Sequence, residues 1–130
     1  MSNPDDPRSW IDKAHGDLRC IRNNLGCDIV PWDIIAYHSQ QAAEKALKAI
    51  LAGKGVQIPH THDLGRLLGD SMRADVQVQH LAEDCDLLTP YAVASRYPGD
   101  EPDIDEVRAR EAHEAAERIV DAVIRILQLE

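Results

Sequence analysis

The stretch that decides the fold of this chain is residues 31–53, PWDIIAYHSQQAAEKALKAILAG. Within it, small and aliphatic side chains recur at steps of three and four, which is the spacing of one face of an α-helix. They form two neighbouring lines, Ile35, Ala42, Ala46 and Ala49 beside Ala36, Ala43, Leu47 and Ile50. So wide an alanine-rich face predicts a long helix that other backbones can approach closely.

The opposite face of the same segment is polar and carries His38, Gln41, Lys45 and Lys48, again at steps of three and four. Glu44 precedes Lys48 by one helical turn, so the two side chains can form an ion pair along the helix. A single histidine on such a face is most often solvated. The two lysines still offer a local positive strip, so these four polar residues are candidate ligand contacts.

Helix signals also flank this segment. The first predicted helix follows Asp6–Pro7, an N-cap residue with proline at the first helical position, and it ends at Gly26. After the loop GKGVQIPHTH, a short helix is predicted from His62 to Arg73, with Thr61 as its candidate cap.

Two further helices complete the pattern. One is predicted over residues 76–95, where Pro90 should kink it or break it. The last begins near Asp103, a candidate N-cap, and no segment alternates like a strand. We therefore expect an all-α fold, an antiparallel up-and-down four-helix bundle with a short extra helix, in one domain of residues 1–130 with its core at about 7–128.

Composition agrees with a soluble helical domain. Hydrophobic residues make up 44% of the chain and charged residues 28%, while aromatics are only 4%, which favours helices over strands. Three cysteines are too few for a disulfide scaffold, and Cys85 falls on an apolar helix stripe as a core residue. With a polar N-terminus and no apolar run long enough to span a bilayer, the chain is predicted to be cytoplasmic and not a membrane protein.

The net charge of −9 limits which ligands and macromolecules the chain is expected to bind. An acidic surface repels phosphate, so binding to duplex DNA is not expected. Much of the negative charge lies near the N-terminus, at 83–86 and at 100–106, away from Lys45 and Lys48. A small basic pocket for one phosphorylated ligand therefore remains compatible with the composition.

Several kinds of site are missing from the sequence. His60 and His62 form a pair without the third converging ligand that a metal site needs, so a loop or cap role is the more frequent explanation. Neither a glycine-rich phosphate loop nor a GxSxG nucleophile motif occurs. No metal site and no cofactor are predicted.

The most distinctive local pattern is Tyr91-x4-Arg96-Tyr97-Pro98. Arginine can hold a phosphate and tyrosine can stack on a base. The same residues also suit the end of a helix, because arginine is favourable at the C-terminus and Tyr-Pro stops the helix. On the residues alone, both explanations stay open.

Four segments resemble the HEPN family (higher eukaryotes and prokaryotes nucleotide-binding domain). They are WIDKAHGDLRCIRNNL, YHSQQAAEKALKAILAGKG, PHTHDLGRLL and ASRYPGD, in the family's order over about residues 7–128. The pattern HxQQAxEKxLKA is specific and stands here at residues 38–49. The resemblance implies an up-and-down bundle of four or five helices that is usually a homodimer.

Two functional lines follow from the resemblance. One branch of the family consists of metal-independent endoribonucleases, often toxins, that use an Arg-x4–6-His motif before the last helix. Arg96 occupies that region, but Tyr97 and the residues after it contain no histidine within seven positions, and Arg108 and His113 come later. Ala115 stands where the nucleotidyltransferase-paired ribonucleases carry a tyrosine.

The expected function is therefore that of the other branch, a nucleotide- or substrate-binding partner of a minimal nucleotidyltransferase in a two-component, toxin–antitoxin-like system. The expected ligand contacts are Tyr91, Arg96, Tyr97, His38, Gln41, Lys45 and Lys48. Two alternatives stay open: a ribonuclease toxin with Arg96, Arg108 or His113 in catalysis on RNA, and a purely structural dimerisation module.

Overall fold

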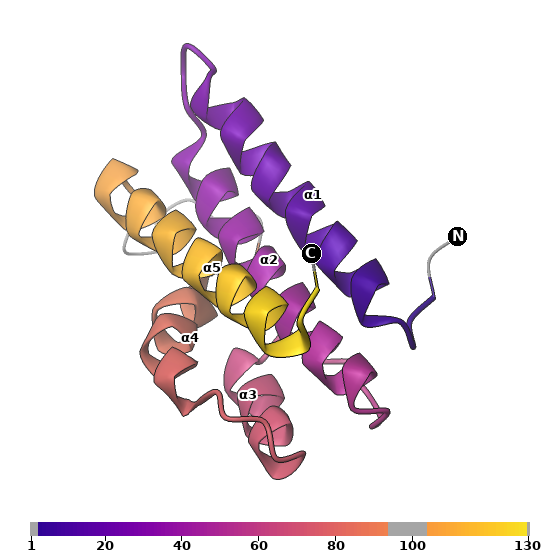
Figure 1. Ribbon diagram of the computed structural model, residues 1–130. Helices are drawn as coiled ribbons and strands as arrows, with labels where there is room; N and C mark the ends of the chain where they lie inside the picture. Colours follow the sequence, from indigo (N-terminus) through magenta and orange to yellow (C-terminus); the bar gives the residue numbers. More distant parts are fainter. Residues whose placement is uncertain (1–2, 94–103, 130) are drawn as a thin grey trace.

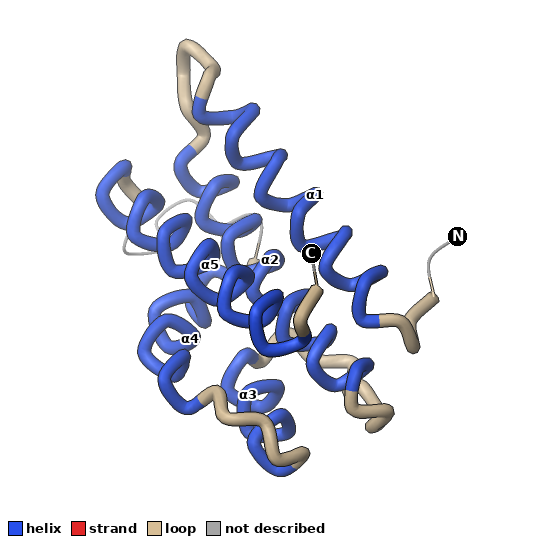
Figure 2. Tube along the Cα trace, in the orientation of Figure 1, coloured by secondary structure: helices blue, strands red, loops and turns tan. Residues whose placement is uncertain are grey.

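Helix α2 (Trp32–Gly53) runs through the middle of the molecule, and the other helices pack around it (Figure 1). The structure is a computed structural model that describes residues 3–93 and 104–129. In these two ranges it contains helices, turns and loops and no strand, as Figure 2 shows. The central place of α2 explains its alanines, because helices that approach from several sides leave little room for larger side chains.

Helix α1 (Pro7–Leu25) packs along α2 in the opposite direction. It begins as predicted, with Pro7 in the first turn and the Asp6 carboxylate accepting a hydrogen bond from the backbone N–H of Arg8 at 2.9 Å. Its apolar stripe of Ile11, Ala14, Leu18 and Ile21 is buried, and Gly26, where the helix was predicted to end, follows its last residue.

Helix α5 (Glu106–Leu127) packs on another side of α2 and runs in the same direction as α2 (Figure 1). Its N-cap is Asp105, whose carboxylate accepts a hydrogen bond from the backbone N–H of Arg108 at 2.9 Å. The predicted cap, Asp103, lies outside the described residues. The up-and-down order is thus α1, α2, a return segment and α5, which confirms the predicted all-α bundle.

In the return segment, the predicted short helix up to Arg73 is present, and so is the predicted break at Pro90, but the helix predicted over 76–95 is divided into shorter pieces. The segment consists of α3 (Leu64–Arg73), the 3₁₀ turn η1 (Gln79–Leu81), α4 (Ala82–Leu88) and the 3₁₀ turn η2 (Thr89–Tyr91). Asp75 ends α3 in a left-handed conformation, with φ of 66°, and so sets the residues after it out of helical register. Pro90 carries no backbone N–H for an α-helical bond, and the chain tightens there into η2.

The cap of α3 also differs from the prediction. The Asp63 carboxylate accepts from the backbone N–H of Arg66 at 3.3 Å, while the Thr61 hydroxyl accepts from the backbone N–H of Asp63 at 3.1 Å. Thr61 therefore shapes the approach to α3, and Asp63 caps the helix.

One core joins these helices. It is formed mainly by alanine and aliphatic side chains of α1, α2 and α5, with Leu64, Leu67, Val78, Cys85 and Leu88 from the return segment. None of the described helices combines the length with the apolar character that a bilayer span requires.

Candidate functional site

A buried acid on α1 binds two of the predicted ligand contacts on α2. Asp17 lies in the apolar stripe of α1 and is only 7% exposed. Its carboxylate accepts from Nδ1 of His38 at 2.8 Å and from Nζ of Lys45 at 2.7 Å. His38 and Lys45 therefore stabilise the contact between α1 and α2, and they are not the solvated surface groups that an isolated polar face would present.

A second acid, Glu44, gathers a larger set of groups and is 4% exposed. Its carboxylate accepts from Nζ of Lys48 at 3.0 Å, from Nδ1 of His62 at 2.9 Å and, at 3.4 Å, from Nε2 of Gln40. The Gln40 amide also donates to the backbone carbonyl of His62 at 3.0 Å. Glu44 thus fastens the loop before α3 to the middle of α2.

The hydrogen bonds to Glu44 keep it ionised. Burial by itself raises the pKa of this carboxyl, but the hydrogen bonds from His62 and Lys48 outweigh burial and hold the pKa below its usual value of 4.5. The predicted pair of Glu44 with Lys48 is present. The part played by His62 was not predicted, because nothing in the local sequence places a loop histidine against this glutamate.

The polar face of α2 is consequently a seam between elements, formed by His38, Gln40, Gln41, Glu44, Lys45 and Lys48; we call it the polar seam. Gln41 donates to Oε1 of Gln40 at 2.8 Å, and Lys48 is 9% exposed. His38 was expected to be solvated, but its side chain is only 26% exposed, because α1 covers this side of the polar seam, and the loop before α3 covers the other side.

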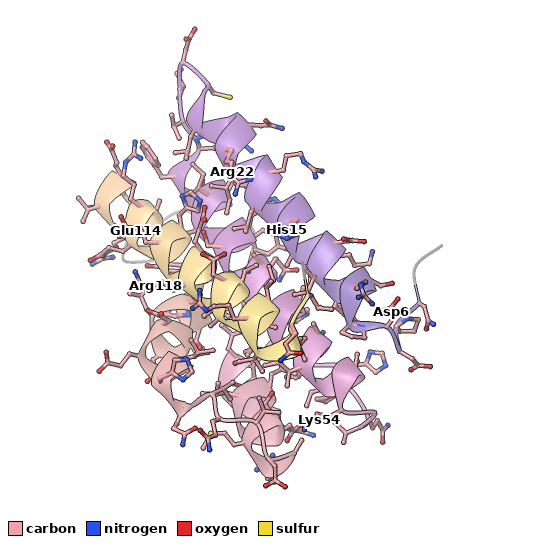
Figure 3. All side chains as sticks on the ribbon, in the orientation of Figure 1. Asp6, His15, Arg22, Lys54, Glu114 and Arg118 are labelled. Carbon is pink, nitrogen blue, oxygen red and sulfur yellow. The ribbon has the colours of Figure 1, made fainter. Side chains whose placement is uncertain are left out.

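A hollow of about 690 Å³ opens at one end of the polar seam. The residues that line it are Pro4, Asp5, Trp10, Lys48, Ala52, Gly55, Val56, Gln57, Ile58, Pro59 and His60. It lies where α1 begins and α2 ends, the end of the molecule marked by Asp6 and Lys54 in Figure 3.

Two side chains define the inner wall of this hollow. Nζ of Lys48 lies 5.6 Å from the centroid of the Trp10 ring, within cation–π distance. The Trp10 indole N–H donates to the backbone carbonyl of Pro4 at 2.9 Å, which folds the N-terminal segment against the hollow. Trp10 was not among the predicted site residues; its position beside the stripe of α1, in a chain with few aromatics, was the available signal.

The predicted Tyr91-x4-Arg96-Tyr97 site is described in part. Tyr91 ends η2 and packs half-buried against the core. Arg96 and Tyr97 lie outside the described residues.

The two remaining catalytic candidates both lie on α5. Arg108 and His113 are five positions apart, so their side chains leave the helix about 140° from each other. Nε2 of His113 is 2.8 Å from Oε1 of Glu117, at an angle that makes no hydrogen bond. These two side chains do not converge on one place along this helix.

The histidine pair of the loop is also divided. His60 lines the hollow, whereas His62 binds Glu44. Among the residues that the structure describes, no group of three or more histidine, cysteine, aspartate or glutamate side chains could hold a metal ion.

Comparison with known proteins gives the same family by sequence and by three-dimensional structure. The model of the HEPN domain matches residues 7–127. The crystal structure of TT1696 from Thermus thermophilus is 28% identical, with a TM-score of 0.79 over 92% of this chain and 97% of that one. ST0689, an archaeal HEPN homologue, is 25% identical, with a TM-score of 0.74 over 94% of this chain and 98% of that one. The search of curated proteins gave no match. With its sequence matched from α1 to the end of α5 and its fold shared with these structures, the chain belongs to the HEPN family.

Proposed function

We propose that this HEPN protein is the nucleotide- or substrate-binding partner of a minimal nucleotidyltransferase in a two-component, toxin–antitoxin-like system, and that it works as a homodimer. The observation that carries the proposal is the HEPN match over residues 7–127. The ribonuclease branch is disfavoured, because Arg108 and His113 lie within α5, the last helix, and the Arg-x4–6-His motif of that branch comes before the last helix.

In this proposal, Arg96 pairs with a phosphate of the ligand, and Tyr91 or Tyr97 stacks on its base. His38, Gln41, Lys45 and Lys48 come second, because each already has a partner within the bundle. Their polar atoms would contribute through the hydrogen-bonding capacity that these partners leave: two N–H groups on each lysine and one ring nitrogen on the histidine.

Calorimetric titration of the purified protein with ATP, GTP and a short single-stranded RNA tests ligand binding. We expect saturable binding of one of the three that Arg96→Ala abolishes. Arg125→Ala removes an exposed arginine near the end of α5 and should leave binding unchanged. No binding of any of the three, together with normal behaviour of Arg96→Ala in cells, would contradict the nucleotide site.

The partnership needs a separate measurement. We expect the chain to co-purify with a minimal nucleotidyltransferase encoded beside it, and light scattering of the free chain should give the mass of a dimer. Co-purification without nucleotide affinity would instead show an interaction module. Toxicity on expression that His113→Ala removes would show a ribonuclease.

A further inference from the structure

We propose that the hollow beside Trp10 is a binding site for a small organic acid, a molecule with a flat apolar body and one acidic group. The apolar body lies along Trp10 and Ile58, and the acidic group meets the ammonium of Lys48. This inference goes beyond the nucleotide proposal, which depends first on Arg96, Tyr91 and Tyr97 and shares only Lys48, one of its secondary contacts, with the hollow.

The size and the walls of the hollow define the body of the ligand. A volume of about 690 Å³ lies within the range of about 300–1,000 Å³ that small-molecule sites occupy. Its apolar lining comes from the Trp10 ring, Ala52, Val56, Ile58 and Pro59. Tryptophan offers a flat face on which another ring can stack. Because the indole N–H is already bound to the carbonyl of Pro4, the ring is fixed in place before a ligand arrives.

Lys48 defines the charge of the ligand. Its ammonium is held by Glu44 on one side and by the Trp10 ring on the other, and the residue is 9% exposed while lining the hollow. An ammonium has three N–H donors, and one bond to Glu44 leaves donor capacity for an acid in the hollow. Little water surrounds the group, so a hydrogen bond to it is stronger than one at the surface.

The two acids nearby do not cancel this preference. Glu44 is not a lining residue, and its oxygens already accept hydrogen bonds from Gln40, His62 and Lys48 within the polar seam. Asp5 does line the hollow, but it is exposed, so solvent and salt screen its charge. A buried cation and a screened anion together favour a ligand that carries a negative charge.

The test uses the whole 130-residue chain, labelled with ¹⁵N, and three probes of similar shape: naphthoate, naphthamide and naphthylmethylammonium. Two-dimensional nitrogen–proton NMR spectra recorded during titration report both the affinity of each probe and the residues near which it binds. We expect naphthoate to shift the indole N–H of Trp10 and the amides of residues 55–58 and 60, and to bind at least about tenfold more tightly than naphthamide, because it adds a charge-assisted hydrogen bond. The ammonium probe should bind least.

Substitutions test whether Lys48 is the positive charge that binds the acidic group. Lys48→Gln should reduce naphthoate affinity to that of naphthamide, whereas Lys54→Gln, at the exposed lysine just after α2, should leave it unchanged. Since Lys48→Gln can loosen the fold, Val56→Glu provides a second test: Val56 is 42% exposed, and a carboxylate there should weaken naphthoate binding about tenfold more than Val56→Gln does.

Asp5→Asn should strengthen naphthoate binding, and Arg96→Ala should leave it unchanged, which separates this site from the nucleotide site. No saturable shift at millimolar naphthoate would overturn the proposal. So would equal affinity for naphthoate and naphthamide, tighter binding of the ammonium probe, or shifts that avoid Trp10 and residues 55–60.

Discussion

Glu44 is the residue on which the polar seam depends. Its carboxylate is buried and accepts from Lys48, His62 and Gln40. We expect Glu44→Gln to lower the free energy of unfolding by about 3 kcal/mol, because it leaves the buried Lys48 ammonium without its counter-charge. Urea unfolding followed by circular dichroism measures the change. The matched control, Glu114→Gln on the exposed face of α5, should change stability by less than about 0.5 kcal/mol.

The same carboxylate gives this effect a pH dependence. Because His62 and Lys48 lower the pKa of Glu44 in the folded state, the stabilisation is fully present above the usual value of 4.5 and is lost as pH falls through the lower folded pKa. The difference in stability between the unmodified protein and Glu44→Gln should therefore be constant near neutral pH and should shrink in acid. A difference that grows on acidification would contradict this assignment of charge.

Cys85 differs from the other two thiols in its environment. Burial, with a smaller contribution from the charges of Asp84 and Asp86, raises its pKa to about 12. The thiolate is the reactive form, so Cys85 should react with Ellman's reagent at pH about 8 at least about 100-fold more slowly than the exposed Cys27.

Single-thiol variants make the comparison between these two cysteines. Cys20→Ser with Cys27→Ser leaves Cys85, and Cys20→Ser with Cys85→Ala leaves Cys27. The variant that retains Cys85 should release one equivalent of colour in urea. Rapid reaction of that variant before denaturation would show that the thiol is accessible.

At the scale of residues, the sequence predicted contacts within one helix and missed those between segments. The Glu44–Lys48 pair follows from a spacing of one helical turn. The contacts of Asp17 with His38 and of His62 with Glu44 join positions far apart in the chain, and a single sequence holds no record of which distant acid faces which base. Asp17 did give one signal, since an acid inside an apolar stripe must find a buried partner.

At the scale of elements, the sequence predicted a helix end correctly where the capping residues were unambiguous. Asp6–Pro7 predicted the start of α1 correctly. The break predicted at Pro90 is present, but the helix predicted to begin near residue 76 begins only at Gln79, because residues 76–78, which follow the left-handed Asp75, are not helical. Those backbone states depend on how the return segment packs on α2 and α5.

An ion pair fastens the short helix α4 to α5. The Arg118 guanidinium donates to both oxygens of Asp84, from Nε at 3.0 Å and from Nη2 at 2.8 Å, and Figure 3 shows Arg118 on the side of α5 that faces α4. A double-mutant cycle with Arg118→Gln and Asp84→Asn should give a coupling energy of about 0.5 kcal/mol, because the Arg118 side chain is 57% exposed to water, and salt should reduce it.

The control cycle uses Arg22 and Glu117, which join α1 to α5 at 3.7 Å. At that separation the pair has no directed hydrogen bond, so its coupling energy should be near zero. Equal coupling energies in the two cycles would mean that the bidentate hydrogen bonding at Asp84 adds no stability beyond that of two opposite charges lying close together.

For the whole molecule, cooperativity should follow from the position of α2. This helix contacts α1, α3, α4 and α5, and most of its residues from 35 to 52 are buried. The return segment from 64 to 91 is built of short helices and 3₁₀ turns with exposed polar surface. Opening the return segment exposes less apolar area than separating α2 from its neighbours, so the two parts should differ in local stability.

Native-state hydrogen exchange followed by mass spectrometry measures this difference. We expect amides of residues 64–91 to exchange through partial opening, at a free energy at least about 2 kcal/mol below that of global unfolding. Amides of residues 36–51 should exchange only on global unfolding, with the full dependence on urea. Arg118→Gln should lower the opening free energy of α4 and leave α2 unchanged, because the ion pair stabilises α4 on α5 and not α5 on α2. Uniform protection of α2 and the return segment would instead mean that the short helices fold and unfold with the bundle as one unit, and that the interruptions at Asp75 and Pro90 do not divide it.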